Sequence, residues 1–239
     1  MSSVERPDGT RPEPVEGPAG GEQPESRTLV HLVRHGLVQN PGGILYGRLP
    51  DYHLSEIGRE MAAVTAGFLA GRDVTHLRCS PLERAQESME PIAAVYPIPV
   101  TIDGRVIEAG NLLEGQLVSF GGPAMRRPKN WWLFRNPLRP TWGEAYTEIV
   151  ARMRLAMRDA AAAARGHEAI VVSHQLPIWM ARCDAEGRRL AHDPRRRECA
   201  LSSVTSFAFV GDRITTVSYA SPAQELIPSR KSKKFVAGA

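Results

Sequence analysis

Cysteines are few in this sequence, and the ones present do not pair. Cys79, Cys183 and Cys199 are an odd number and lie far apart, so they form neither a CxxC motif nor a disulfide framework. This usage favours a reducing compartment. No apolar run approaches the ~18 residues of a spanning helix, and the N-terminus lacks the basic-then-apolar pattern of a secretion signal. We therefore expect a cytoplasmic protein without a membrane partner.

A concentrated basic surface is also missing. The formal net charge is only +4 and the pI is about 9.2. The positive residues are scattered except for short clusters, so no stripe is predicted that could follow a nucleic-acid backbone. Phosphorylated small molecules fit this mild basicity better, and we expect no nucleic-acid partner.

The N-terminal end of the chain contains almost no apolar residues. Residues 1–27 hold five prolines, four glycines and many charges. Such a segment cannot bury enough surface to offset its ordering entropy, so we predict a disordered tail. Residues 229–239 carry four cations and are predicted to form a second, basic tail. The domain is expected to span 28–228, where the 42% hydrophobic content of the chain is enough to build a core.

Between the tails, short apolar runs alternate with amphipathic segments. This alternation predicts one α/β domain, a three-layer α/β/α sandwich with a mostly parallel central sheet. The predicted strands are 28–34, 74–79, 97–102, 169–173, 203–210 and 213–219. The predicted helices are 55–70 with Ser55 as N-cap, 81–95 opened by Pro81, 142–165, and 177–182.

Cationic and nucleophilic residues follow three of the predicted strands. The first strand ends in Arg34-His35-Gly36, the second leads into Ser80 to Arg84, and the third ends in Ser173-His174. Ligands of parallel α/β folds bind at the carboxyl ends of the strands. These groups are therefore expected to converge on one crevice.

The residue types suit phosphoryl chemistry. A neutral imidazole such as His35 is a good nucleophile that can carry a phosphoryl group, and nearby cations would hold its pKa low. Arg34 and Arg84 present planar forks that match phosphate oxygens. His174 can donate one more hydrogen bond, and Gly36 is expected to let the chain turn tightly beneath the phosphate.

A leaving alkoxide needs a proton donor, and a carboxylic acid is the usual choice. Glu108 and Glu114 are the two candidates, and the residues alone leave the choice between them open. Positioning and charge stabilisation dominate phosphoryl transfer, so two arginines and two histidines could suffice without a metal or another cofactor.

Several motifs together resemble one known family. Leu32 to Gly36, followed by Asn40, Gly47 and the segment 54–58, is similar to the opening signature of the histidine phosphatase (phosphoglycerate mutase-like) superfamily. The segment 80–85 is similar to its second motif and 171–174 to its third. The resemblance covers about residues 28–220 and implies the phosphoglycerate mutase-like fold.

The resemblance also implies residue roles. His35 would be the nucleophile, Arg34, Arg84 and His174 would bind phosphate, and Glu108 would act as acid and base. Gly36, Asn40 and Gln175 are further candidates for substrate contacts. Departures from the family pattern bear on these secondary contacts: Leu37-Val38 replaces a polar pair, Asn40 comes one residue early, and Gln175 stands in place of a glycine.

A metal site is the alternative interpretation of His31 and His35. Their i, i+4 spacing is that of a zinc-binding helix. On a strand, however, four residues span about 13 Å, too far for two side chains to share a metal ion. No other cluster has ligand spacing, and no metal is expected.

Two arginine clusters and an insert have more than one interpretation. Arg126-Arg127 could bind a second anionic group, although exposed surface is preferred, and residues 195–197 are predicted to be a surface loop. The insert at about 117–140 contains adjacent tryptophans and four prolines. It is predicted either to cap the crevice or to be pinned to the domain.

The expected function is that of a phosphomonoesterase, a histidine acid phosphatase of the phosphoglycerate mutase-like kind, which hydrolyses a small phosphorylated metabolite through a phosphohistidine. One alternative is a bisphosphoglycerate-dependent phosphoglycerate mutase, in which the phosphoryl group passes to a second hydroxyl. The other is a non-catalytic phospholigand-binding module. Loss of His35 or Glu108 would have favoured the last, and both are present.

Overall fold

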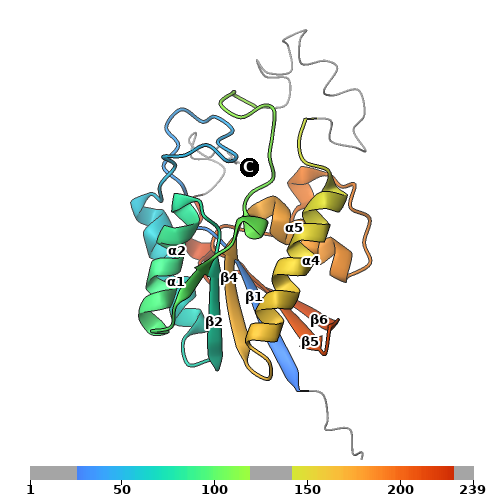
Figure 1. Ribbon diagram of the computed structural model, residues 1–239. Coiled ribbons are helices and arrows are strands. Elements are labelled where there is room, and N and C mark those ends of the chain that lie inside the picture. The colour runs from blue at the N-terminus through green and yellow to red at the C-terminus, as the bar shows by residue number, and fades with distance from the viewer. Residues whose placement is uncertain (1–25, 119–141, 229–239) are drawn as a thin grey trace, which may run out of the picture.

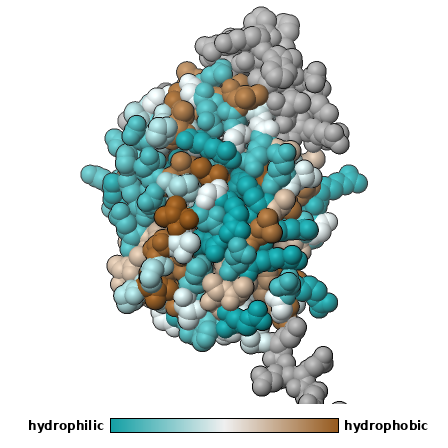
Figure 2. Space-filling model, viewed as in Figure 1, coloured by the Kyte–Doolittle hydropathy of each residue, from teal (hydrophilic) through white to brown (hydrophobic). Residues whose placement is uncertain are grey.

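A computed structural model describes residues 26–118 and 142–228 of the chain. The predictions for residues 1–25, for the second tail and for most of the insert, including its arginines and tryptophans, lie outside these residues. The first tail ends earlier than predicted, because Arg27 begins the first strand. In the described part no helix is long and apolar enough to cross a membrane. Figure 2 shows that hydrophilic residues dominate one face of the molecule, with hydrophobic residues in small separate groups.

A mixed sheet of six strands forms the middle layer, in the order β3-β2-β4-β1-β5-β6 (Figure 1). The pairs β1–β4, β2–β4 and β2–β3 are parallel, and β5 and β6 add an antiparallel hairpin beside β1. The bounds are β1 Arg27–Arg34, β2 Val74–Cys79, β3 Val100–Ile102, β4 Glu168–Ser173, β5 Val204–Val210 and β6 Arg213–Ala220. The predicted α/β sandwich is confirmed.

Two pairs of helices cover the two faces of the sheet (Figure 1). One pair is α1 (Glu56–Leu69) with α2 (Glu83–Val95), and the other is α4 (Tyr146–Ala163) with α5 (Gln175–Ala185). Short 3₁₀ helices η1 (Gly104–Val106) and η3 (Pro194–Arg196) lie in the connections, and η4 (Gln224–Leu226) follows β6.

Successive strand residues supply the cores on opposite faces, because side chains alternate along a strand. Leu32 of β1 and Val171 of β4 pack with α4 and α5. Their neighbours Val33 and Val172 pack with α1 and α2. Because these strands are buried on both faces, their sequences are continuous apolar runs. Such runs are easily recognised, so these strands could be predicted from the sequence.

Helix boundaries follow local chemistry, and some predicted bounds are corrected. Ser55 is the N-cap of α1, and its hydroxyl accepts the Gly58 N–H at 3.0 Å. α2 begins at Glu83, not at Pro81. α4 begins at Tyr146, not at 142, because residues 142–144 instead pair with 110–112 through backbone hydrogen bonds. β3 is shorter than predicted, since Pro97 and Pro99 have no N–H to donate.

The parallel register brings three strand ends to one edge of the sheet. Arg34 at the end of β1 pairs with Ser173 at the end of β4, and Cys79 at the end of β2 pairs with Val172. The residues that follow these strands, among them His35 and His174, therefore leave the sheet side by side. This edge is where the candidate site lies.

Candidate active site

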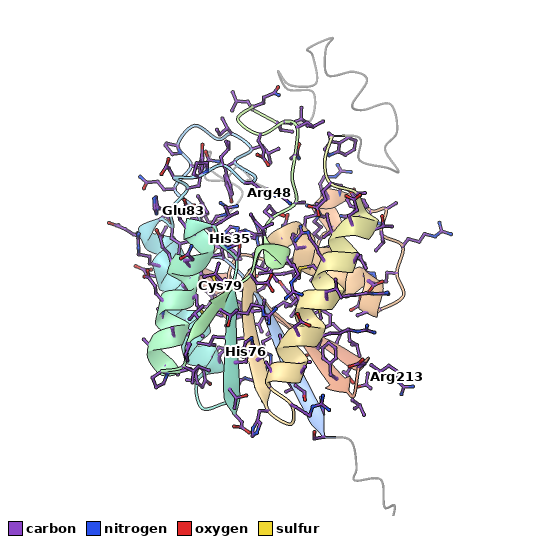
Figure 3. All side chains as sticks on the ribbon, in the orientation of Figure 1. His35, Arg48, His76, Cys79, Glu83 and Arg213 are labelled. Atoms are coloured by element: carbon purple, nitrogen blue, oxygen red, sulfur yellow. The ribbon has the colours of Figure 1, made fainter. Side chains whose placement is uncertain are left out.

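Five side chains that the sequence singled out meet at this edge, all of them buried. His35 follows β1, Arg84 lies in α2, His174 is the N-cap residue of α5, and Glu108 follows η1. Arg34 completes the set at the end of β1. The rings of His35 and His174 are 5.1 Å apart between centroids. Figure 3 shows His35 and Arg48 toward the same end of the strands, with Arg213 at the other end.

His35 is held in a defined tautomer. Its Nδ1 lies 2.8 Å from the carbonyl oxygen of Gly36, so Nδ1 carries the hydrogen and donates it. Nε2 then presents a lone pair, and it has no partner among the described residues. Burial and the charges of Arg84 and Arg34 hold the pKa of His35 well below 6.5. The imidazole is therefore neutral and oriented, as a nitrogen nucleophile needs to be.

His174 contributes a hydrogen-bond donor. Its Nε2 lies 2.7 Å from the Ser80 hydroxyl, which also accepts the Leu82 N–H. With the hydroxyl proton directed to Nε2, the hydrogen of His174 is on Nδ1, which has no partner among the described residues. Burial, with Arg84 next, holds the pKa of His174 well below 6.5. The ring is neutral and can donate one hydrogen bond to a ligand.

The two arginines are anchored by carbonyl oxygens and keep free donors. Arg34 Nη1 donates to Cys199 O at 2.7 Å, and Arg84 Nη2 donates to Gly47 O at 2.5 Å. The Arg84 guanidinium also lies 4.8 Å above the Tyr46 ring centroid. Arg34 Nε, Arg84 Nε and Arg84 Nη1 have no partner in the described structure. Anchoring by neutral groups leaves both positive charges available to an anion.

Glu108 is an acid in a buried setting. Its Oε1 accepts the Ala109 N–H at 2.8 Å, while Oε2 has no partner among the described residues. Burial raises the pKa of Glu108 above its ordinary value of 4.5, against the lowering effect of the Ala109 N–H and Arg84. A carboxyl group that keeps its proton at higher pH is suited to general acid catalysis.

Unpartnered buried polar atoms are rare in folded proteins, because each costs the free energy of its lost hydration. Here six such atoms belong to the five side chains of one site. Five are nitrogens, of which four on Arg34, Arg84 and His174 can donate and one, Nε2 of His35, can attack. The sixth is a carboxyl oxygen of Glu108. A bound phosphoryl group would satisfy this combination of donors, nucleophile and acid.

Gly36 is needed for a different reason from the one predicted. Its φ is not positive, and a Cβ at this position would meet the Gly58 carbonyl oxygen at 2.3 Å. The glycine therefore allows α1 to approach the strand end, and no tight turn is involved. Its N–H donates to Ser88 Oγ at 3.0 Å. The segment that carries His35 is thus held by the α1 backbone and by the Ser88 side chain.

The other predicted residues have structural partners. Asn40 holds its own loop through the N–H and carbonyl of Ile44. Glu114 accepts the N–H groups of Arg48 and Asn111, so it holds a loop, while Glu108 is the buried acid. Gln175 donates to Cys199 O and accepts from Arg197. Among the described contacts, none brings Asn40 or Glu114 to His35.

Sequence reasoning assigned no role in the site to four residues that lie around it. Tyr46 lies beneath Arg84, Ser80 holds His174, and Arg152 holds the backbone before Glu108. The prediction that residues 195–197 form a surface loop is wrong for Arg197, which is partly buried and contacts Gln175. Only Ser80 had a signal in the sequence, since it directly follows a strand.

The segment that carries Glu108 is clamped by two arginines and one carboxylate. Arg48 Nε donates to the Glu108 carbonyl at 2.7 Å, and Arg152 Nη1 donates to the carbonyls of Arg105 and Ile107 at 2.6 and 2.8 Å. Glu144 joins the clamp, since it accepts from Arg48 at 2.8 Å and from Arg152 at 2.7 Å. Three backbone carbonyls around the acid are thereby held by one ionic network.

Breaking this clamp is expected to misplace the acid. In Glu144→Gln, Arg48 and Arg152 lose their shared counter-charge, and we expect kcat for an alkyl phosphate to fall about 10- to 100-fold. An ester with a good leaving group should be less affected, because it depends less on proton donation. Glu148→Gln, which changes an exposed glutamate of α4, is the matched control. Equal losses on both esters would contradict a positioning role.

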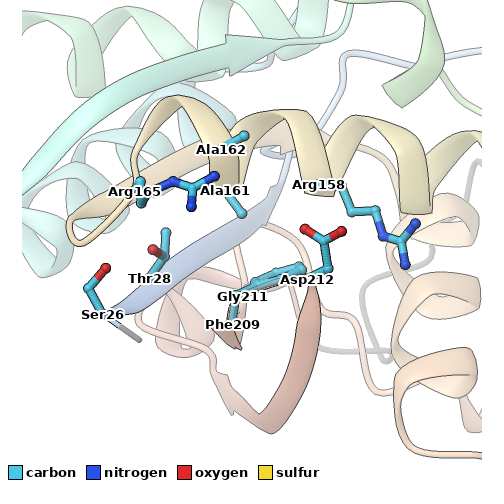
Figure 4. A pocket seen from close by; sticks show the side chains of 9 residues that line it. All are labelled: Ser26, Thr28, Arg158, Ala161, Ala162, Arg165, Phe209, Gly211 and Asp212. Carbon is cyan, nitrogen blue, oxygen red and sulfur yellow. The ribbon is translucent and has the colours of Figure 1, made fainter. Parts of the chain in front are cut away.

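Other cavities do not coincide with this chemistry. A pocket of about 80 Å³ lies at the far end of β1 from His35 and is lined by Thr28, Arg165, Phe209 and Asp212 among others (Figure 4). Within the described ranges, no group of three or more His, Cys, Asp or Glu residues is placed to hold a metal ion. The three cysteines are free and buried.

The family model that represents the histidine phosphatase superfamily (branch 1) matches residues 30–222 of the sequence. The chain belongs to this superfamily. All five side chains described above fall within the matched region.

Individual proteins are also similar to the chain. An uncharacterized protein of Mycobacterium tuberculosis is 52% identical over 196 residues, covering 82% of this chain and 97% of its own length. A probable phosphoglycerate mutase of Yersinia pestis is 28% identical over 181 residues, covering 73% of this chain and 83% of its own length. The solved structure of a mycobacterial glucosyl-3-phosphoglycerate phosphatase superposes with a TM-score of 0.64 at 20% identity, covering 81% and 96% of the two chains. That last likeness shows the shared fold.

Proposed function

We propose that this histidine phosphatase superfamily member is a metal-independent phosphomonoesterase that acts on a small phosphorylated metabolite. The observation that carries the proposal is the state of His35: Nδ1–H is donated to Gly36 O, and the free Nε2 lone pair lies in a site of unpartnered arginine and histidine donors. A binding module would need the donors alone. It would not need an oriented nucleophile and a buried acid with a raised pKa.

The first step transfers the phosphoryl group to the enzyme. The Nε2 lone pair of His35 attacks phosphorus while the bond from phosphorus to the ester oxygen breaks. Glu108 gives its proton to the departing oxygen, so the alcohol leaves neutral. Arg34, Arg84 and His174 bind the phosphoryl oxygens and stabilise the charge that they carry in the transition state. The Nδ1–H bond to Gly36 O stabilises the positive phosphoimidazole.

The second step returns the enzyme to its starting state. The ionised Glu108 takes a proton from a water molecule, and the water oxygen forms a bond to phosphorus as the bond from phosphorus to Nε2 breaks. His35 leaves as a neutral imidazole, and Glu108 is protonated again. The atoms of one ester and one water are thus recovered as one alcohol and one phosphate.

Phosphate release tests this proposal. We expect the full chain to hydrolyse p-nitrophenyl phosphate at an unchanged rate with and without chelator, and to be inhibited competitively by vanadate. A panel of phosphorylated metabolites then ranks the substrates. A rate that disappears with chelator and returns with added zinc or magnesium would contradict the metal-independent mechanism. A 3-phosphoglycerate mutase rate that depends on bisphosphoglycerate and exceeds hydrolysis would instead identify a mutase.

A further inference from the structure

Arg197 differs from most arginines in the described structure because it has no counter-charge. Five of the arginines that are not exposed contact a carboxylate within ion-pair distance, namely Arg72, Arg78, Arg105, Arg152 and Arg182. In the described residues Arg34, Arg84 and Arg197 have no such partner. Two of these three belong to the proposed phosphate site. The third shares their defining feature, a guanidinium held only by neutral groups.

Neutral acceptors orient Arg197. Its Nε lies 2.8 Å from His192 Nε2, and its Nη1 lies 3.3 Å from Gln175 Oε1. His192 Nδ1 donates to Leu190 O at 2.6 Å, so Nε2 carries the lone pair that accepts from Arg197. The His192 ring packs on Tyr146, at 5.5 Å between centroids. An imidazole that accepts a hydrogen bond is neutral, so His192 does not compensate the positive charge of Arg197.

The Arg197 guanidinium lies beside the proposed phosphate site. The Cys199 carbonyl accepts from Arg34 at 2.7 Å and from Gln175 at 3.4 Å, and Gln175 in turn accepts from Arg197. Burial lowers the pKa of Arg197, the charge of Glu108 raises it, and the charge of Arg34 lowers it. Glu108 is on the leaving-group side of the phosphoryl group, because it protonates the departing oxygen in the proposed reaction. Arg197 is therefore placed near the part of the substrate that leaves.

We propose that Arg197, oriented by His192 and Gln175, is a specificity-determining residue that binds a second anionic group of the substrate. This inference rests on the proposed function, and it defines the substrate class as phosphate monoesters whose alcohol carries a carboxylate or a further phosphate. Both anions present paired oxygens that match the guanidinium fork. The adjacent Arg195 and Arg196 are exposed, and Arg195 already pairs with Asp193.

Pairs of substrates that differ only in the second anion test the proposal. 3-Phosphoglycerate and glycerol 3-phosphate differ by a carboxylate, and fructose 1,6-bisphosphate and fructose 6-phosphate differ by a phosphate. We expect the wild-type protein to prefer the more anionic member of one pair, measured as the ratio of kcat/KM. The pair with the larger ratio identifies whether the anion is a carboxylate or a phosphate.

Replacing Arg197 should reduce that preference. In Arg197→Gln we expect the ratio to fall about 10- to 100-fold, the effect of losing charge-assisted hydrogen bonds. Arg197→Lys keeps the charge without the guanidinium fork, and its ratio should lie between those of the wild type and of Arg197→Gln. Arg196→Gln, which removes an exposed arginine next to it, should leave the ratio unchanged. An equal loss on both members of each pair would show that Arg197 only supports its loop, and would overturn the proposal.

Binding measurements separate this proposal from the catalytic one. In His35→Ala the nucleophile is removed and Arg197 is retained, so calorimetry can compare the affinities of the same four compounds without turnover. The subsite is supported if His35→Ala binds the more anionic compound of a pair more tightly and the double variant with Arg197→Gln does not. This result would hold even if the wild type hydrolysed no ester. Equal affinities within both pairs overturn the subsite, whatever the phosphatase assays show.

Discussion

Replacing His35 by alanine is expected to reduce phosphate release by a factor on the order of 10⁴ or more, because the nucleophile of the first step is lost. The arginines and His174 remain in place, so the variant should still bind vanadate. His167→Ala, which changes an exposed histidine paired with Asp73, is the control and should keep its rate. Melting temperatures of both variants check that they fold.

The same substitution should abolish the covalent intermediate. Wild-type enzyme quenched during turnover is expected to carry one phosphoryl group on Nε2 of His35, labile in acid and stable in base, as a phosphorus–nitrogen bond is. His35→Ala should carry none. Near-normal turnover in this variant, or a phosphoryl group located on another residue, would overturn the mechanism.

The position of the site was predictable because parallel strands determine it. Three buried apolar runs could be recognised from composition, and each was followed by Arg34-His35, by Ser80 to Arg84, or by Ser173-His174. Parallel pairing then brings their ends together, and the register of Arg34 with Ser173 confirms this expectation. Local sequence and sheet geometry were sufficient for this part of the site.

The acid was harder to choose because it lies in a loop. Glu108 and Glu114 are six residues apart in a segment without periodicity. Only tertiary packing distinguishes them: Glu108 is buried at 2% exposure with a free oxygen, while Glu114 accepts backbone N–H groups. The motif resemblance favoured Glu108, and the residues alone did not.

Long-range partners could not be predicted from the sequence. Arg197 is one of three consecutive arginines, and nothing in such a run distinguishes the one that turns inward. Its partners Gln175 and Tyr146 come from two other elements. The need for glycine at position 36 was unpredictable for the same reason. It depends on the carbonyl of Gly58, a contact between a strand end and a helix.

Replacing Glu108 by glutamine should reduce the rate on alkyl phosphates by about 10²- to 10⁴-fold, the usual contribution of a general acid. The amide keeps the size of the side chain and can still accept the Ala109 N–H. With p-nitrophenyl phosphate the first step should survive, because p-nitrophenolate leaves without protonation. The variant is then expected to release a burst of p-nitrophenol equal to the enzyme concentration, followed by slow turnover, since hydrolysis of the phosphohistidine has lost its base.

The pH profile adds a second, independent test of Glu108. Burial raises the pKa of Glu108, so its acid form persists above pH 4.5, and burial with Arg84 lowers the pKa of His35, so its neutral form persists below pH 6.5. On an alkyl phosphate, the wild-type rate should therefore fall at low pH as His35 gains a proton, and at high pH as Glu108 loses one. In Glu108→Gln the low-pH fall should remain and the high-pH fall should disappear. A high-pH fall that persists on the same substrate would assign proton donation to a different group.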